Sequence, residues 1–118
     1  MTPSGAHAED RALDHLRARG LVPVARNYRC RSGEIDLIMG ERETLVFVEV
    51  RYRSSLTFGG PLESVTPAKQ RRILAAARHY LQSHPEAGSR PCRFDVVAIS
   101  PRASPPLLWV RDAFQSAP

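Results

Sequence analysis

Two consecutive segments of this chain have the composition of β-strands but carry acidic residues among their apolar ones. They are Gly33–Ile38 and, after nine intervening residues, Val48–Arg53. A carboxylate inside an apolar strand is costly unless it is paired with a cation or binds a metal ion. Because the feature occurs in two strands in succession, we interpret it as a functional site.

The chain has 118 residues, which is enough for one domain with a single hydrophobic core. We expect residues 1–118 to form that domain, with its core at about 5–111 and with frayed termini. No apolar run approaches the roughly 20 residues that span a bilayer. The N-terminal segment lacks the apolar stretch of a secretory signal, so we expect a cytoplasmic protein with no membrane partner.

Basic residues exceed acidic ones, with 17 Lys and Arg against 12 Asp and Glu and a net charge of +5. Lys69 is the single lysine, and all the other basic residues are arginine. One explanation is codon usage in a GC-rich genome. The other is phosphate binding, for which the planar guanidinium group is well suited. The charge is compatible with a polyanionic partner but does not establish one.

The two cysteines, Cys30 and Cys92, are too few and too far apart for a disulfide framework or a zinc site. We expect both to be buried free thiols. The sequence contains no recognisable Ser-His-Asp or Cys-His arrangement and no glycine-rich phosphate loop. Asp95 follows Phe94 in a later apolar segment, and we interpret this acid as structural.

Periodicity and turn residues predict an α/β domain with a mixed sheet and the order α-β-β-β-α-β-β. The expected helices are Ser4–Arg19 and Pro67 to about Ser83, and the expected strands are Leu21–Arg31, Glu34–Met39, Thr44–Tyr52, Arg93–Ser100 and a short Leu107–Val110. Thr66 is the expected N-cap of the second helix. The segment Thr44–Tyr52 is apolar on both faces, which is typical of a central strand. Pro23 favours an edge position for its own strand.

The spacing of the acidic residues decides whether they can meet. Side chains alternate across a strand, so Glu34 and Asp36 share one face of theirs, and Phe47 and Glu49 share one face of the next. A connecting turn with an even number of residues would place Asp36 opposite Phe47 or Glu49, on the same side of the sheet. A turn with an odd number would separate the two carboxylates.

The first helix carries a further candidate acid. Glu9 lies on its apolar stripe together with Ala12, Leu13 and Leu16. If this helix packs on the side of the sheet that carries the other carboxylates, Glu9 can join them. The alternative is a boundary carboxylate near the positive N-terminal end of the helix.

Convergence of Glu9, Asp36 and Glu49 would create a repulsion that a divalent cation relieves. Oxygen ligands suit Mg²⁺ or Mn²⁺, and such an ion can polarise a phosphate and activate water for phosphodiester hydrolysis. Arg51 would point into the same site and neutralise developing charge. In the alternative reading, Glu34 and Asp36 pair with arginines at a sheet edge, and Glu49 forms an ordinary ion pair with Arg51.

Several motifs together resemble a known family of small bacterial proteins, the YraN family. They are the helix with Glu9, Asn27-Tyr28-Arg29, Gly33–Ile38, Phe47–Arg51, Phe58-Gly59, Lys69–Arg72 and Phe94–Val97. That family is similar to archaeal Holliday junction resolvases and to the wider PD-(D/E)xK nuclease superfamily. The resemblance implies a restriction-endonuclease-like core, with a mixed central sheet flanked by helices.

The resemblance also implies roles for individual residues. Asp36 matches the metal-binding aspartate, Glu49 matches the acid of the (D/E)xK element, and Glu9 matches a glutamate of the resolvase branch. Arg51 stands where that pattern has lysine, and unlike lysine it cannot shed its proton near neutral pH. Arg51 can still stabilise charge, so we expect activity to be reduced, altered or lost.

The implied function is a Mg²⁺- or Mn²⁺-dependent endonuclease for structured or branched DNA that acts as a homodimer. Its phosphate contacts would come from a basic set of four residues, Arg53, Lys69, Arg71 and Arg72. The alternative for that set is a solvated helix face. Because Arg51 stands where the family pattern has lysine, there is a second interpretation. In it, the protein has a nuclease fold but impaired catalysis, and it binds nucleic acid or a protein partner.

Overall fold

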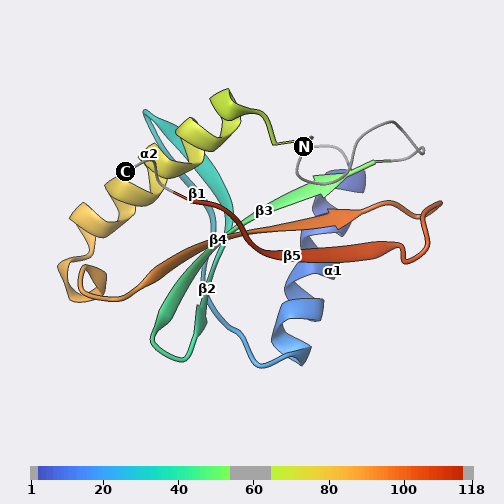
Figure 1. Ribbon diagram of the computed structural model, residues 1–118, viewed down its shortest axis with the longest axis horizontal. Coiled ribbons are helices and arrows are strands. Elements are labelled where there is room, and N and C mark those ends of the chain that lie inside the picture. Colours follow the sequence, from blue (N-terminus) through green and yellow to red (C-terminus); the bar gives the residue numbers. More distant parts are fainter. Residues whose placement is uncertain (1–2, 54–64, 116–118) are drawn as a thin grey trace.

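The computed structural model describes residues 3–53 and 65–115 of the chain (Figure 1). The elements are helices α1 (Pro3–Ala18) and α2 (Pro67–Ser83), the 3₁₀ turn η1 (Pro85–Ala87), and strands β1 (Val22–Cys30), β2 (Gly33–Glu41), β3 (Thr44–Tyr52), β4 (Cys92–Ile99) and β5 (Leu107–Phe114). Their order confirms the predicted α-β-β-β-α-β-β arrangement. The last strand runs four residues beyond the predicted end at Val110.

Two sequence expectations fall on parts of the chain outside the described residues. One is the motif Phe58-Gly59, which belongs to the stretch 54–64. The other is the fraying of the termini, which concerns 1–2 and 116–118.

The five strands form one mixed sheet in the order β1-β2-β3-β4-β5. Strands β3 and β4 are parallel, and the other neighbouring pairs are antiparallel. A parallel pair needs a long crossover connection, and here the connection contains α2. Strand β1 is an edge strand, as Pro23 indicated, and its pairing with β2 is irregular between Pro23 and Ala25.

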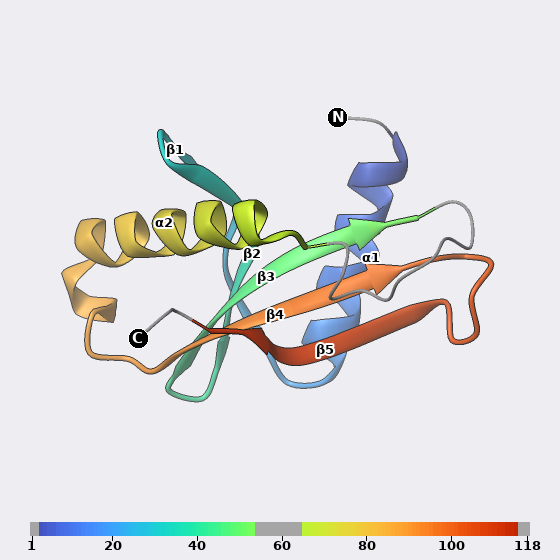
Figure 2. The same ribbon diagram turned by 45° about the horizontal axis from the view of Figure 1, so that its top comes forward.

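One helix covers each face of the sheet (Figure 2). On the α2 side, buried residues of the strands, such as Phe47 and Val96, pack with Ile73 and Tyr80 of the helix. On the α1 side, the core contains Ala8, Ala12, Leu16, Leu21, Leu37, Met39, Val46, Val48, Val97 and Ile99. Strand β3 contributes to both clusters, which confirms that it is a central strand with two buried faces.

Both cysteines are free, but the expectation that both are buried is wrong. Cys30 is partly buried and Cys92 is exposed. Cys30 ends the edge strand β1 and Cys92 begins β4, so both lie at strand ends. Neither helix in the described part of the chain is long and apolar enough to cross a lipid bilayer.

Candidate metal-binding and catalytic site

The turn between β2 and β3 brings the two strand carboxylates to the same side of the sheet. Glu41 pairs with Thr44 across a two-residue turn, and the ladder runs from there to Leu37 opposite Val48. One further step in the same register places Asp36 opposite Glu49. The turn is therefore of the even-numbered kind, and Arg42 has the positive φ of 55° that a tight hairpin turn favours.

Asp36 is held by the backbone of the neighbouring strand. Its Oδ2 atom accepts a hydrogen bond of 2.8 Å from the amide of Val50. Burial raises the pKa of Asp36 to about 7, and the nearby negative charge of Glu49 acts in the same direction. The Val50 amide and the charge of Lys69 oppose this rise. At neutral pH the Asp36 carboxyl group therefore holds a proton in part of the molecules, because burying its negative charge is costly.

Glu49 is almost fully buried, with 3% of its side chain exposed, and two cations reach it. The Nζ atom of Lys69 lies 3.2 Å from its Oε2 atom, and an Nη atom of Arg51 lies 3.5 Å from the same oxygen. The Nε atom of Arg51 is buried and has no hydrogen-bond partner among the described residues. The carboxylate pair is thus flanked by positive charge that includes one unused donor.

Glu9 lies apart from this pair, although it is buried on α1. Its Oε1 atom contacts the Nε atom of Arg26 at 3.4 Å, and another nitrogen of Arg26 contacts Asp10 at 2.7 Å. Burial raises the pKa of Glu9, and the charge of Asp36 raises it further, so the two acids are within electrostatic range. Within residues 3–53 and 65–115, no group of three or more His, Cys, Asp or Glu side chains is arranged to hold a metal ion.

Three of the four predicted phosphate-contacting residues are exposed. Arg71 and Arg72 lie on the outer side of α2, and Arg53 directly follows β3. Lys69 differs from them because its ammonium group is directed to Glu49. The start of β2 lies against α2: a Cβ atom added at Gly33 would be 2.3 Å from the carbonyl oxygen of Arg72. The β1–β2 hairpin is thereby held beside the basic side of the helix.

Asp95 has the structural role that the sequence indicated. Its carboxylate is fully buried and accepts hydrogen bonds from Arg93 at 2.9 and 3.0 Å, from the indole of Trp109 at 2.9 Å and from the amide of Asp112 at 2.9 Å. These partners join β4 to β5. The hydrogen-bond partners of Asp95 are all on β4 and β5, so Asp95 is not part of the Asp36–Glu49 pair.

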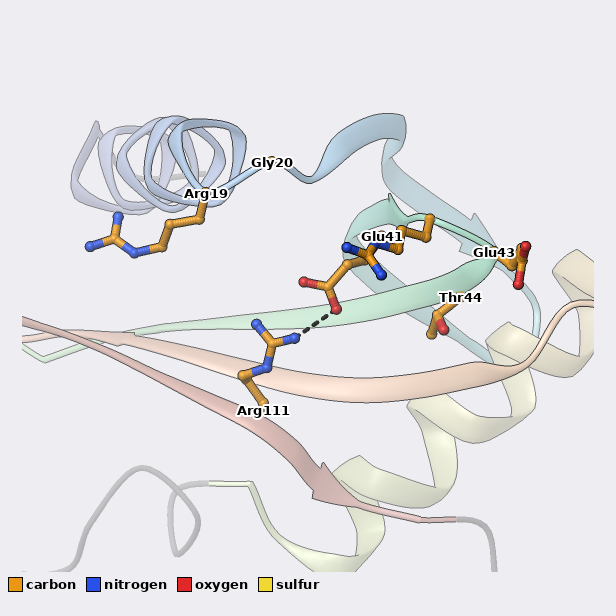
Figure 3. Close-up of a pocket in the computed structure, with 7 residues that line it drawn as sticks. Arg19, Gly20, Glu41, Glu43, Thr44 and Arg111 are labelled. Atoms are coloured by element: carbon orange, nitrogen blue, oxygen red, sulfur yellow. Dashed lines mark hydrogen bonds and ion pairs between the residues drawn. The ribbon is translucent and has the colours of Figure 1, made fainter.

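A cavity of about 610 Å³ lies beside the turn between β2 and β3 (Figure 3). It is lined by Arg19, Gly20, Glu41, Arg42, Glu43, Thr44 and Arg111. Within it, Glu41 is bound by Arg111 at 2.6 Å and by Arg93 at 2.7 Å. The hydrogen bond from Arg93, and to a lesser extent the one from Arg111, holds the pKa of Glu41 below its usual value. Both arginines contact the Oε1 atom of Glu41, and neither Asp36 nor Glu49 lines the cavity, so it is distinct from the candidate site.

Sequence reasoning missed two pairings of the candidate site, Lys69 with Glu49 and Arg26 with Glu9. A signal for the first was present, because Lys69 lies four residues before Ile73 and so extends the buried stripe of α2. No local pattern pointed to the second, since Arg26 is on a different element from Glu9.

Comparison with known proteins agrees with the motifs. Residues 8–99 match the uncharacterised protein family UPF0102. A UPF0102 protein of Cupriavidus necator is 60% identical over 111 residues, which cover 93% of this chain and 81% of that protein. A UPF0102 protein of Nitrosococcus oceani is 55% identical over 112 residues, covering 94% and 90% of the two chains. One of Pseudomonas entomophila is 51% identical over 114 residues, covering 95% and 93%.

Proposed function

This chain belongs to the uncharacterised protein family UPF0102, and we propose that it is a metal-dependent endonuclease that hydrolyses phosphodiester bonds of structured or branched DNA. UPF0102 is the YraN family that the sequence motifs indicated. The observation that carries the proposal is the placement of Asp36 and Glu49 on the same side of adjacent strands, with two cations at the buried Glu49 carboxylate.

The residues of the pair suit a magnesium or manganese ion. Mg²⁺ commonly uses one or two protein carboxylates and keeps several waters. Asp36 and Glu49 supply hard oxygen donors from adjacent strands, and burial raises the pKa of Asp36 to about 7. When bound, such an ion polarises a phosphate oxygen and lowers the pKa of a water molecule. Glu9 as a third ligand stays a prediction, because it is hydrogen-bonded to Arg26.

The surrounding cations account for substrate binding. The guanidinium group of Arg51 is partly exposed beside the carboxylate pair and would bind a phosphate oxygen there. Arg53, Arg71 and Arg72 are exposed and would bind phosphates further along the DNA. Two copies of the chain would supply one site for each of two strands, so we include a homodimer in the proposal.

The test is incubation of the purified protein with a labelled four-way DNA junction and Mg²⁺ or Mn²⁺. We expect cleavage that Asp36→Asn lowers by at least about 100-fold, the scale on which removal of a transition-state-stabilising group acts. Glu34→Gln is the matched control, because Glu34 is on the same strand but exposed and paired with Arg29. Cleavage that survives Asp36→Asn unchanged would contradict the proposal.

Arg51 favours a second candidate function, binding of nucleic acid without hydrolysis. Its guanidinium group already lies 3.5 Å from Glu49 and cannot release a proton near neutral pH. Under this alternative the junction is bound with an affinity that falls as salt rises, and no product appears with either metal. Absence of both binding and cleavage would leave only a domain that binds a protein partner.

A further inference from the structure

The only lysine of the chain is placed at the candidate site. Lys69 is the sole lysine beside sixteen arginines, and its Nζ atom lies 3.2 Å from the Oε2 atom of Glu49. The side chain is 31% exposed, so the ammonium group lies between the buried carboxylate and the surface. A compact point charge fits such a place better than a planar guanidinium group.

The start of α2 fixes this position. Thr66 is the N-cap and accepts a hydrogen bond of 3.2 Å from the backbone amide of Lys69, and Pro67 begins the helix. Lys69 is therefore in the first turn, one turn before the buried Ile73. Its long apolar stem can pass along the core-facing side of the helix while the charge reaches Glu49. The neighbouring Arg71 is on the opposite, exposed side of the helix.

Lys69 and Arg51 approach the same oxygen of Glu49 from different elements. Arg51 comes from β3 itself and makes the longer contact, 3.5 Å against 3.2 Å. Lys69 is thus the cation with the shorter contact to Glu49, even though its position in the sequence is far from the strand motif.

We infer that Lys69 is the positioning residue of this site. It brings a lysine ammonium group to Glu49 from helix α2, whereas the strand carries arginine at position 51. It holds the Glu49 carboxylate in place and offsets the charge of the pair. The inference rests on the proposed function and deepens it. It also gives Lys69 a role different from that of the exposed Arg71 and Arg72, which contact phosphates outside the pair.

The test compares Lys69→Met, which keeps the unbranched apolar stem of the side chain and removes its charge, with Arg71→Met on the same helix. From initial rates over a range of junction concentrations, we expect Lys69→Met to lower kcat by at least about 30-fold with KM changed less than about 3-fold. Arg71→Met should raise KM and leave kcat nearly unchanged. Introducing Arg51→Lys into Lys69→Met should restore at least about 10-fold of the lost kcat, because a lysine on the strand can reach the same carboxylate.

A second readout does not depend on activity. Binding of Mn²⁺ to the protein alone, followed by the electron paramagnetic resonance signal of the free ion, should become about 5-fold tighter in Lys69→Met, because a competing positive charge is removed. Arg71→Met should bind Mn²⁺ like the unmodified protein. Lys69→Gln serves in both measurements if the methionine variant does not fold.

The outcomes separate the two proposals. If the unmodified protein cleaves DNA and Lys69→Met matches it in kcat and in Mn²⁺ affinity, the role of Lys69 is refuted and the nuclease proposal stands. If the unmodified protein neither binds Mn²⁺ nor cleaves any junction, the nuclease proposal fails and the role of Lys69 fails with it.

Discussion

The Oδ2 atom of Asp36 lies 2.8 Å from the backbone nitrogen of Val50, the residue that follows Glu49. This hydrogen bond lies just beyond the end of the β2–β3 ladder, whose last pair is Leu37 with Val48. The side chain of Asp36 thus continues the connection between the strands and directs its carboxyl group toward Glu49. The energetic consequence is a carboxyl group whose pKa of about 7 is far above its usual range, mainly because it is buried.

Asp36→Asn is expected to stabilise the protein at alkaline pH. A carboxyl group with a raised pKa in the folded state contributes stability that is fully present below the pKa of the unfolded chain, near 4, and is lost as pH rises through about 7. Asparagine can still accept the Val50 hydrogen bond but has no charge to bury. Urea unfolding in the presence of a chelator should show a gain on the order of 2 kcal/mol at pH 8 and little gain at pH 4.

The control for this measurement is Glu34→Gln, an exposed change on the same strand, which should alter the free energy of unfolding by less than about 0.5 kcal/mol. An Asp36→Asn variant that is destabilised to the same extent at both pH values would contradict the raised pKa.

Asp95→Ala is expected to lower the free energy of unfolding by about 3 kcal/mol or more, because it leaves a partly buried guanidinium and an indole N–H without their acceptor. Chemical denaturation measures the loss. Asp112→Asn is the matched control: it keeps the backbone amide that Asp95 accepts from, and asparagine tolerates the φ of 51° at this position. Equal stability of the Asp95→Ala variant and the unmodified protein would show that the network contributes little.

Gly33→Ala is expected to destabilise the protein by about 1–3 kcal/mol, the usual cost of forcing extra atoms into a packed contact. The new Cβ atom would meet the backbone of Arg72 at 2.3 Å, and a backbone oxygen cannot rotate away as a flexible side chain can. Gly88→Ala provides the comparison, since its nearest contact is 3.3 Å. Thermal unfolding of the two variants should differ clearly, and similar midpoints would rule out a tight contact between hairpin and helix.

Thr66→Ala should cost about 1 kcal/mol of stability because the first turn of α2 loses its N-cap hydrogen bond to Lys69. Thr66→Ser retains the hydroxyl group and should recover most of the loss. Urea denaturation gives the stability change, and amide hydrogen exchange at the start of α2 shows whether fraying is local. Faster exchange spread evenly over α2 would mean that the cap does not act on the first turn alone.

Local chemistry was sufficient to predict much of the fold. Thr66 followed by Pro67 marked the start of α2 at the residue where the structure has it, because a cap and a fixed φ act within a few residues. The apolar pattern of Thr44–Tyr52 gave both ends of β3. The length of β5 was underestimated, since Arg111 and Asp112 look like chain ends until their partners Glu41 and Asp95 are known.

By itself, the sequence determined that Asp36 and Glu49 would share one side of the sheet if their short connecting turn had an even number of residues. Side-chain alternation and a two-residue turn are local properties, so this pairing required no knowledge of the rest of the chain. Only the tertiary structure decided that Lys69 reaches Glu49 and that Glu9 binds Arg26. Those contacts depend on how two helices dock on opposite faces of the sheet, which the packing of both cores sets.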